Sequence, residues 1–353
     1  MALGALEATT FEAPAVEAAA RDVPLVPRVS RVGVLRATTG APVQRCQALD
    51  ACRGAAVVAM LFANFVNVFL HEVPNVLAHN RGNTFHLFDF PAPFFQFLSG
   101  VSLVLFLEKR RAEGLAPGGS KLAAVRRFFV LIGLGVLLDG IGSLQLRPRW
   151  GVLQTLGLGG LVATALANLP DLAVTAVTMC LLALFSGRYN GEVHGNPIAA
   201  IAFVPLTLAG MVLGRGLRRG RLRSMFLQRA AGVTTVGAVV AAGTYLAGVP
   251  FNKVLGTSSF AGLTGALSAA ALLVTAEWEQ QGRRFPAWLL ALGRSALTAW
   301  VLQYVLVYYP AWLLFPTWQR LPLVPGLLAA LVALTSIMCL TVTLGRRGVR
   351  VPL

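Results

Sequence analysis

A histidine-rich segment lies just before the second long apolar run of the sequence. It contains His71, His79 and His86, spaced eight and seven residues apart, and Asp89 follows shortly after. An imidazole exchanges a proton close to neutral pH, and a carboxylate beside it can fix its tautomer and orientation. The residue types suit a general base with an orienting carboxylate, although solvated loop histidines would also explain them.

Three histidines at this spacing also raise the question of a metal site. Structural zinc sites use four protein ligands and catalytic sites use three plus a water. In this part of the sequence only Glu72 or Asp89 could complete such a set with the histidines. We therefore expect no bound metal.

The apolar run before this segment carries polar residues at its start and in its interior. Within LDACRGAAVVAMLFANFVNVFLHEV, Asp50 and Arg53 are three residues apart, which places them on one face of a helix where they can pair. Asn64 lies deeper, and an amide surrounded by lipid needs a hydrogen-bond partner. Polar groups in a membrane span are functional candidates, although a helix cap and a topology signal would also explain Asp50 and Arg53.

The elements that must position these residues are long apolar segments. Hydrophobic residues make up 56% of the 353-residue chain and charged residues 12%, with a mean hydropathy of +0.70. Soluble domains carry about 25% charged residues, so this chain has too few to cover a soluble fold. We therefore expect an all-α, polytopic integral membrane protein with about 10–11 transmembrane helices of about 20 residues each. The candidate spans are 54–70, 90–107, 128–144, 151–167, 171–186, 198–214, 230–247, 258–276, 287–309 and 322–343. The shorter ones would also suit re-entrant segments.

The distribution of basic residues predicts an orientation. The net charge is +16, but the basic residues come in short clusters between apolar runs, which is typical of cytoplasmic loops and excludes a nucleic-acid-binding surface. With the N-terminus inside, most of the 30 Lys and Arg residues lie on the cytoplasmic side. We therefore expect both termini to be cytoplasmic and the histidine-rich segment to lie on the outer face.

The composition also divides the chain. Residues 1–44 are rich in Ala, Pro and Arg and predict a disordered cytoplasmic tail. Residues 45–345 form the transmembrane domain, and residues 346–353 form a basic cytoplasmic tail. The Ala-, Arg-, Gly-, Leu- and Val-rich composition suits a bacterium, so we expect a bacterial inner membrane or plasma membrane.

Several short motifs, in order, resemble a known family. LDACRG, MLFANF and DFPAPFFQFLSG are followed by GVLQTLG, PFNKVLGTSSF and LGRSALTAWVLQ. Together they resemble the heparan-alpha-glucosaminide N-acetyltransferase family and its bacterial relatives, from Arg45 to about Gln303. In that family a histidine after the LDxxRG helix is catalytic and an asparagine in that helix assists it. The resemblance assigns these roles to His79 and Asn64, with Asp89 as the orienting partner of the imidazole.

The resemblance implies a membrane acyltransferase that moves an acetyl group from cytoplasmic acetyl-CoA to an acceptor on the outer face, an amino sugar or another glycan. His79 would then take a proton from the attacking nitrogen or carry the acetyl group itself. Candidate contacts to the nucleotide follow, since guanidinium groups suit phosphate. They are Asp50, Arg53, Arg126, Arg127 and Arg294, and the candidate substrate contacts are Asn252 and Lys253.

Two other functions stay open at this stage. A multi-span permease or a lipid or solute transporter would use the intramembrane polar groups for passage. A catalytically inactive relative is suggested by Thr155, which stands where the family has an arginine. Coenzyme A binding separates the enzyme from the transporter. A homo-oligomer also remains open.

Overall fold

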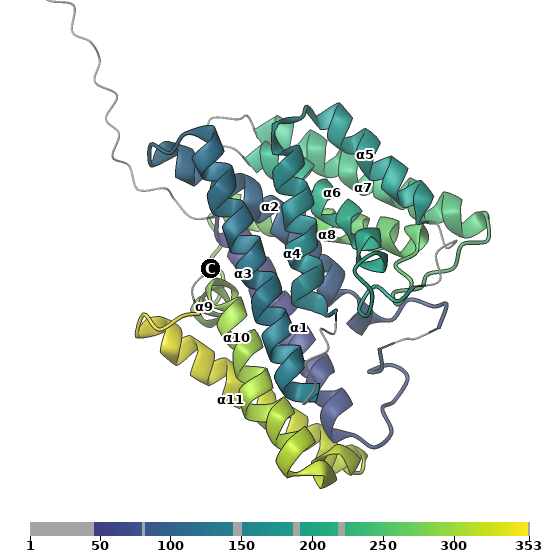
Figure 1. Cartoon of the computed structure of the whole chain (residues 1–353), viewed down its shortest axis with the longest axis vertical. Helices are drawn as coiled ribbons and strands as arrows, with labels where there is room; N and C mark the ends of the chain where they lie inside the picture. Colours follow the sequence, from purple (N-terminus) through teal and green to yellow (C-terminus); the bar gives the residue numbers. More distant parts are fainter. Residues whose placement is uncertain (1–45, 80–81, 144–149, 186–190, 218–222, 352–353) are drawn as a thin grey trace, which may run out of the picture. The chain divides into compact units, whose positions relative to one another are not determined.

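The computed structural model describes residues 46–79, 82–143, 150–185, 191–217 and 223–351, and all of them lie in one compact unit, Arg45–Leu353. The expected tail at 1–44 lies outside the described residues. Within the described ranges the regular structure is helical (Figure 1). The first part comprises α1 (Gln47–Phe69), η1 (Leu87–Asp89), α2 (Pro91–Ala112), α3 (Pro117–Ser143), α4 (Val152–Ala165), η2 (Leu166–Asn168) and α5 (Asp171–Leu184). The second part comprises η3 (Ala199–Phe203), α6 (Val204–Gly214), η4 (Arg215–Leu217), α7 (Arg223–Leu246), α8 (Ser258–Gln280), α9 (Ala287–Arg294), α10 (Ala296–Gln303), η5 (Tyr304–Tyr308), η6 (Pro310–Leu314), η7 (Pro316–Arg320) and α11 (Leu323–Arg346).

The expected all-α, multi-pass architecture is confirmed. In the described part of the chain, seven helical stretches are long and apolar enough to cross a membrane. They are Gln47–Phe69, Leu87–Ala112, Ala199–Leu217, Arg223–Leu246, Ser258–Gln280, Ala296–Leu314 and Leu323–Arg346. The three other expected spans are helical too, but α4 and α5 are shorter, and α3 carries Lys121, Arg126, Arg127 and Asp139 along its length.

One expected span is divided in two. The stretch 287–309 contains a break, because Ser295 leaves the helical conformation with φ −120° and ends α9 at Arg294. The chain then continues as α10 and widens into the π-helical segments η5 and η6. The break brings Arg294 to the end of a short helix that packs against α1.

Glycines let two pairs of helices cross at backbone contact. A Cβ at Gly100 of α2 would overlap the carbonyl oxygen of Thr207 in α6, and a Cβ at Gly210 would overlap that of Phe97. The same relation joins α1 and α9, where a Cβ at Gly293 would overlap the carbonyl oxygen of Asp50. Side chains at these positions would push the helices apart, so the glycines fix the position of α2 and α9.

Helix α1 packs against helices from both the first and the last parts of the chain. It packs against α2 and α8, and also against α9, α10 and α11 (Figure 1). Its 23 residues span about 34 Å at 1.5 Å per residue, close to the ~30 Å hydrocarbon core. Residues near its two ends therefore lie near opposite faces of a membrane.

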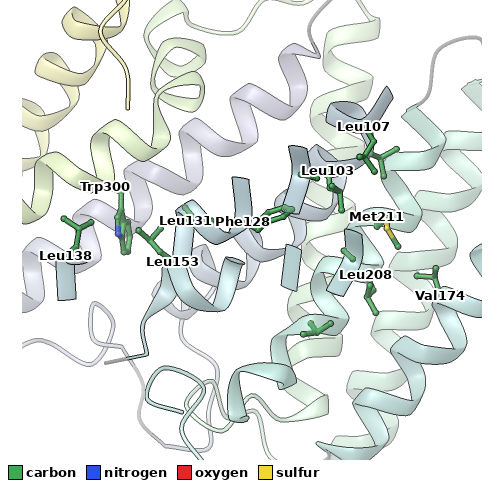
Figure 2. Close-up of a cluster of buried hydrophobic side chains, with 14 of the residues drawn as sticks. Leu103, Leu107, Phe128, Leu131, Leu138, Leu153, Val174, Leu208, Met211 and Trp300 are labelled. Carbon is green, nitrogen blue, oxygen red and sulfur yellow. The ribbon is translucent and has the colours of Figure 1, made fainter. Parts of the chain in front are cut away.

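A large cluster of buried apolar side chains joins α2, α3, α4, α6 and α10. Figure 2 shows it running from Leu138 and Trp300 through Leu131 and Phe128 toward Met211. Each fully buried side chain of this size contributes about 1.5–3 kcal/mol in a soluble protein; within lipid, packing itself supplies the stability. The cluster therefore packs α3 and α4 against the remaining bundle.

The outermost spans expose apolar side chains. The hydrophobic windows of α7 and α11 are 17% and 22% buried. Val239 of α7 and Val332 of α11 are exposed. Exposed apolar faces this long would be a liability in water, and in a bilayer they contact lipid.

Candidate active site

A buried aspartate at the start of α1 gathers two arginines. Asp50 is 1% exposed, and its carboxylate lies 3.4 Å from Arg53 and 3.1 Å from Arg294. Arg53 also donates to the hydroxyl of Ser102 in α2. The predicted Asp50–Arg53 pair is therefore present, and α9 adds Arg294 to it from a distant part of the sequence. The pairing holds two guanidinium groups in fixed positions.

These arginines line a cavity of about 320 Å³. Arg127 of α3 and Arg350, which follows α11, line it as well. The Cζ atom of Arg127 lies 5.4 Å from the ring centroid of Phe106, a cation–π arrangement. By contrast, Arg126 is exposed on α3 and does not line the cavity. We call Arg53, Arg127, Arg294 and Arg350 the arginine cluster.

The cavity becomes apolar away from the arginine cluster. Its lining there includes Met60 of α1, Phe95 of α2, Val152 of α4 and Trp300 of α10. Met60 lies seven residues beyond Arg53 along α1, an axial rise of about 10 Å. The cavity is thus lined by cations near one end of the helices and by hydrocarbon side chains closer to their middle.

Asn64 lies one turn beyond Met60, and its side chain meets an unexpected partner. Its amide donates to Oε1 of Gln303 in α10, at 3.1 Å. Gln303 is fully buried, and its Nε2 has no hydrogen-bond partner among the described residues. The described contacts of Asn64 do not include His79. The structure therefore joins Asn64 to a glutamine that we did not identify from the sequence, although it ends the motif LGRSALTAWVLQ.

At the opposite end of α1, His79 and Asp89 lie together as predicted from their types. His79 Nδ1 is 3.5 Å from Asp89 Oδ1, and Asp89 is fully buried. Asp89 is held by η1, where the His86 backbone N–H donates to Oδ2 at 3.2 Å. Phe88 of η1 packs against Phe62 of α1, with 5.7 Å between ring centroids. The carboxylate is therefore fixed before α2 begins.

Lys253 completes this group. Its Nζ lies 3.4 Å from Asp89 Oδ1 and 3.2 Å from His79 Nδ1. Burial lowers the pKa of Lys253, and the carboxylate of Asp89 opposes that shift. We call His79, Asp89 and Lys253 the histidine cluster. The arrangement lets the carboxylate or the amine engage Nδ1, which leaves Nε2 as the ring nitrogen for proton transfer.

Hydrogen bonds within the loop that carries Lys253 fix its conformation. Thr257 donates to the carbonyl oxygen of Pro250 at 2.7 Å, and the Asn252 side chain accepts from the Leu255 backbone N–H at 3.0 Å. Asn252 also donates to Asn83 at 2.9 Å. Asn252 therefore connects its loop to the loop that carries His79, while Lys253 reaches the imidazole directly.

A fourth histidine, which we missed in the sequence, lies beside this loop. The backbone N–H of Val193 donates to the carbonyl oxygen of Val254 at 2.8 Å, which sets His194 next to Lys253. Both ring nitrogens of His194 are buried without a hydrogen-bond partner among the described residues. Burial, with the nearby charges of Lys253 and His79, lowers its pKa to about 3. A lone histidine in a loop has no sequence pattern that would have identified it.

The other two histidines take different places. His86 Nδ1 lies 3.2 Å from the carbonyl oxygen of Ala78, and His71 is exposed just beyond the end of α1. Across the described residues, no group of three or more His, Cys, Asp or Glu side chains is arranged to hold a metal ion. Thr155 is buried in α4 and accepts a hydrogen bond from Trp150 at 3.2 Å.

These features define a multi-pass membrane protein with a cation-lined cavity near one end of its helices and an imidazole–carboxylate pair near the other. Residues 45–198 match the family model described as heparan-alpha-glucosaminide N-acetyltransferase, catalytic. Residues 158–346 match the family model described as acyltransferase domain. No curated protein matches the chain.

The acyltransferase-domain match covers more than half of the chain, and the chain therefore belongs to this family of membrane acyltransferases. The resemblance to the heparan-alpha-glucosaminide N-acetyltransferase family is confirmed by the other match. That match contains His79 and Asp89, the acyltransferase-domain match contains Lys253, Arg294 and Gln303, and His194 lies where the two matches overlap. The histidine cluster thus draws on both matched regions.

Proposed function

We propose that this acyltransferase moves an acetyl group from acetyl-CoA to an amino sugar or another glycan, with His79 as the general base. The observation that carries the proposal is the pairing of a cavity lined by four arginines with a His–Asp pair at the other end of the same helices. The first site suits an anionic donor and the second suits proton transfer.

The arginine cluster is the proposed binding site for the nucleotide of the donor. Coenzyme A carries phosphates, and guanidinium groups bind phosphate through paired N–H donors. Asp50 holds Arg53 and Arg294 by ion pairs, so little side-chain entropy is lost when phosphate binds. The apolar lining toward Met60 and Trp300 would accommodate the arm that carries the thioester.

Asn64 and Gln303 are proposed to bind the carbonyl oxygen of the thioester. Asn64 lies about 6 Å along α1 from Met60 in the cavity wall, and Gln303 Nε2 is a buried donor without a described partner. A donor aimed at the developing oxyanion lowers the barrier by about 2.7–4 kcal/mol in other acyl-transfer enzymes. This role replaces the direct assistance of His79 by Asn64 that the resemblance implies.

At the histidine cluster, the acceptor amine would attack the thioester carbonyl carbon while His79 takes a proton from the attacking nitrogen. The carbon–sulfur bond then breaks, and coenzyme A leaves as the thiol after taking up a proton. Asp89 stabilises the imidazolium formed in the first step. Alternatively, His79 receives the acetyl group and passes it to the acceptor in a second step. In both routes the donor binds on the cytoplasmic side and the acceptor on the outer face of a bacterial inner or plasma membrane.

Membranes containing the protein should transfer radiolabelled acetyl from acetyl-CoA to glucosamine-terminated glycans. Replacement of the base in His79→Gln should lower the rate by roughly 10²–10⁴-fold. The matched control is His71→Gln, because His71 is exposed and lies outside the histidine cluster. Equal labelling by His79→Gln and wild type would contradict the catalytic assignment. Absence of transfer together with absence of coenzyme A binding would favour a transporter.

A further inference from the structure

A second cavity lies on the far side of the bundle from the site described above. It has a volume of about 250 Å³ and is lined by α5, α6, α7 and α8. Helices α5 and α7 each contribute residues to its lining. Its lining side chains are apolar except for Arg229 and for Thr175 and Thr178 of α5, and the hydroxyl of Thr178 is bonded to the carbonyl oxygen of Val174 within the helix. We call this cavity the α5–α7 groove.

Glycines create the space in the groove. A Cβ at Gly232 of α7 would meet nothing within 4 Å, and one at Gly265 of α8 would meet only Leu206, at an ordinary contact distance of 3.5 Å. Three of the four helices contribute segments long and apolar enough to span a membrane. Water is costly at that depth, so a hydrocarbon chain is the available occupant.

The charged residues at one end of the groove select the headgroup. Arg229 lines the groove and pairs with Asp171 at 2.6 Å, and Arg215 pairs with the same carboxylate at 2.5 Å. Two guanidinium groups share one carboxylate, which leaves a charge of +1 at this end. A guanidinium has five N–H donors, so Arg229 retains donors beyond its bonds to Asp171 and to the Val212 carbonyl oxygen.

The length of the groove matches one leaflet. From Arg229 to Val240 the groove follows α7 for 11 residues, which is about 16 Å of axial rise. Half of the ~30 Å hydrocarbon core is about 15 Å. A single acyl chain whose headgroup phosphate lies at Arg229 would therefore extend along the groove to the middle of the bilayer.

We propose that the α5–α7 groove binds one acyl chain of an anionic membrane phospholipid, with the phosphate at Arg229. The binding site is separate from the proposed catalytic groups, since none of its lining residues belongs to the arginine cluster or the histidine cluster. Helices α5 and α7 both pack against α6 and α8. A lipid bound in the groove would also link α5 directly to α7.

The test uses full-length protein in nanodiscs that contain equimolar phosphatidylglycerol and phosphatidylcholine. After extraction into detergent, bound lipid is counted by native mass spectrometry. Wild type should retain phosphatidylglycerol in preference to phosphatidylcholine. Gly232→Leu, which fills the groove, should lower retention at least 10-fold, and Gly265→Leu from the other wall should do the same. Gly243→Leu is the control, because its Cβ also meets open space but does not line the groove.

Arg229→Met separates the two parts of the proposal, since it should abolish the preference for phosphatidylglycerol while the groove remains open. The thermal unfolding midpoint of each variant identifies any variant that does not fold. If only one of Gly232→Leu and Gly265→Leu folds, its lipid retention alone tests the proposal. Unchanged retention in a folded groove-filling variant, or equal retention of the two lipids by wild type, would overturn the proposal.

Discussion

The two ends of α1 carry sites of different construction. At its start, Asp50, Arg53 and Arg294 lie on helices that cross at Gly54 and Gly293, where the backbones touch. At its other end, His79 and Lys253 lie on loops that are held by hydrogen bonds. The helical site has a rigid geometry from packing, whereas the loop site depends on each polar contact. Mutations of polar groups should therefore have larger effects at the histidine cluster than at the arginine cluster.

The largest effect is expected for Asp89→Asn. The amide removes the negative charge that faces both Lys253 and His79. The rate of acetyl transfer should fall by roughly 10²–10⁴-fold, because the imidazolium loses its partner and the ring its orientation. Initial rates with saturating acetyl-CoA measure the change. The control is Glu72→Gln, an exposed acid in the same loop; equal losses in the two variants would show that Asp89 has no special role.

At the arginine cluster, near the start of α1, Arg294→Ala should have a smaller effect, which is on the binding of coenzyme A. Loss of one charged hydrogen-bond donor costs about 1.5–3 kcal/mol, which corresponds to roughly 10–150-fold weaker binding of coenzyme A. Asp50 keeps Arg53 as a partner in this variant. Arg126→Ala is the matched control, because Arg126 is exposed and outside the cavity. Calorimetry on detergent-purified protein gives the dissociation constant of coenzyme A for each variant. Equally weakened binding in the two variants would contradict the proposal that the cavity binds coenzyme A.

The rigidity of the helical site can be tested by Gly293→Ala. The added Cβ would overlap the Asp50 carbonyl oxygen, and overpacking of this kind costs about 1–3 kcal/mol. We expect a lower unfolding midpoint together with weaker coenzyme A binding, since α9 carries Arg294. Gly133→Ala in α3 meets open space and should stabilise the protein by about 0.5–1 kcal/mol. An unchanged Gly293→Ala variant would indicate that α1 and α9 are not in backbone contact.

An effect on stability alone, with no change expected in coenzyme A binding, concerns His194 and pH. Its pKa is lowered to about 3 in the folded protein, while the unfolded value is near 6.5. Above pH 6.5 both states bind no proton, and below it the unfolded state gains a proton that the folded state does not. Stability should therefore fall as the pH drops from 6.5, by about 2 kcal/mol at pH 5.

The His194→Phe variant should lose this part of the pH dependence, because phenylalanine does not titrate and can keep the edge-on contact with Phe203. Unfolding midpoints at pH 7, 6 and 5 for wild type and variant provide the comparison. Parallel pH profiles would mean that the imidazole is protonated in the folded state or reaches water.

Much of the fold could be predicted from the sequence. Long apolar segments produce helices wherever lipid leaves the backbone no other partner, and in the part of the chain that the structure describes each of the ten expected spans is helical over most of its length. The break at Ser295 was not predicted, because apolar composition alone marks 287–309 as one span. The lengths of α4 and α5 could not be predicted either, since apolar composition alone does not fix where a helix ends.

The candidate site was predictable where its residues are close in sequence. Asp50 and Arg53 are three residues apart, and spacing on a helix sufficed to pair them. Arg294, Gln303 and Lys253 join their partners from more than 150 residues away. Only the family resemblance suggested Arg294 and Lys253, and it did not indicate Gln303. Arg350 belongs to the segment that the sequence predicts to be a basic tail, yet it lines the cavity.

The central claim is that the arginine cluster and the histidine cluster face opposite sides of one membrane. Single cysteines at His79→Cys and Arg347→Cys, introduced after replacement of Cys46, Cys52, Cys180 and Cys339 by serine, can be labelled with a membrane-impermeant maleimide in sealed vesicles of known orientation. We predict that position 79 is labelled from the outer side and position 347 only from the cytoplasmic side. Labelling of both positions from the same side would contradict the account.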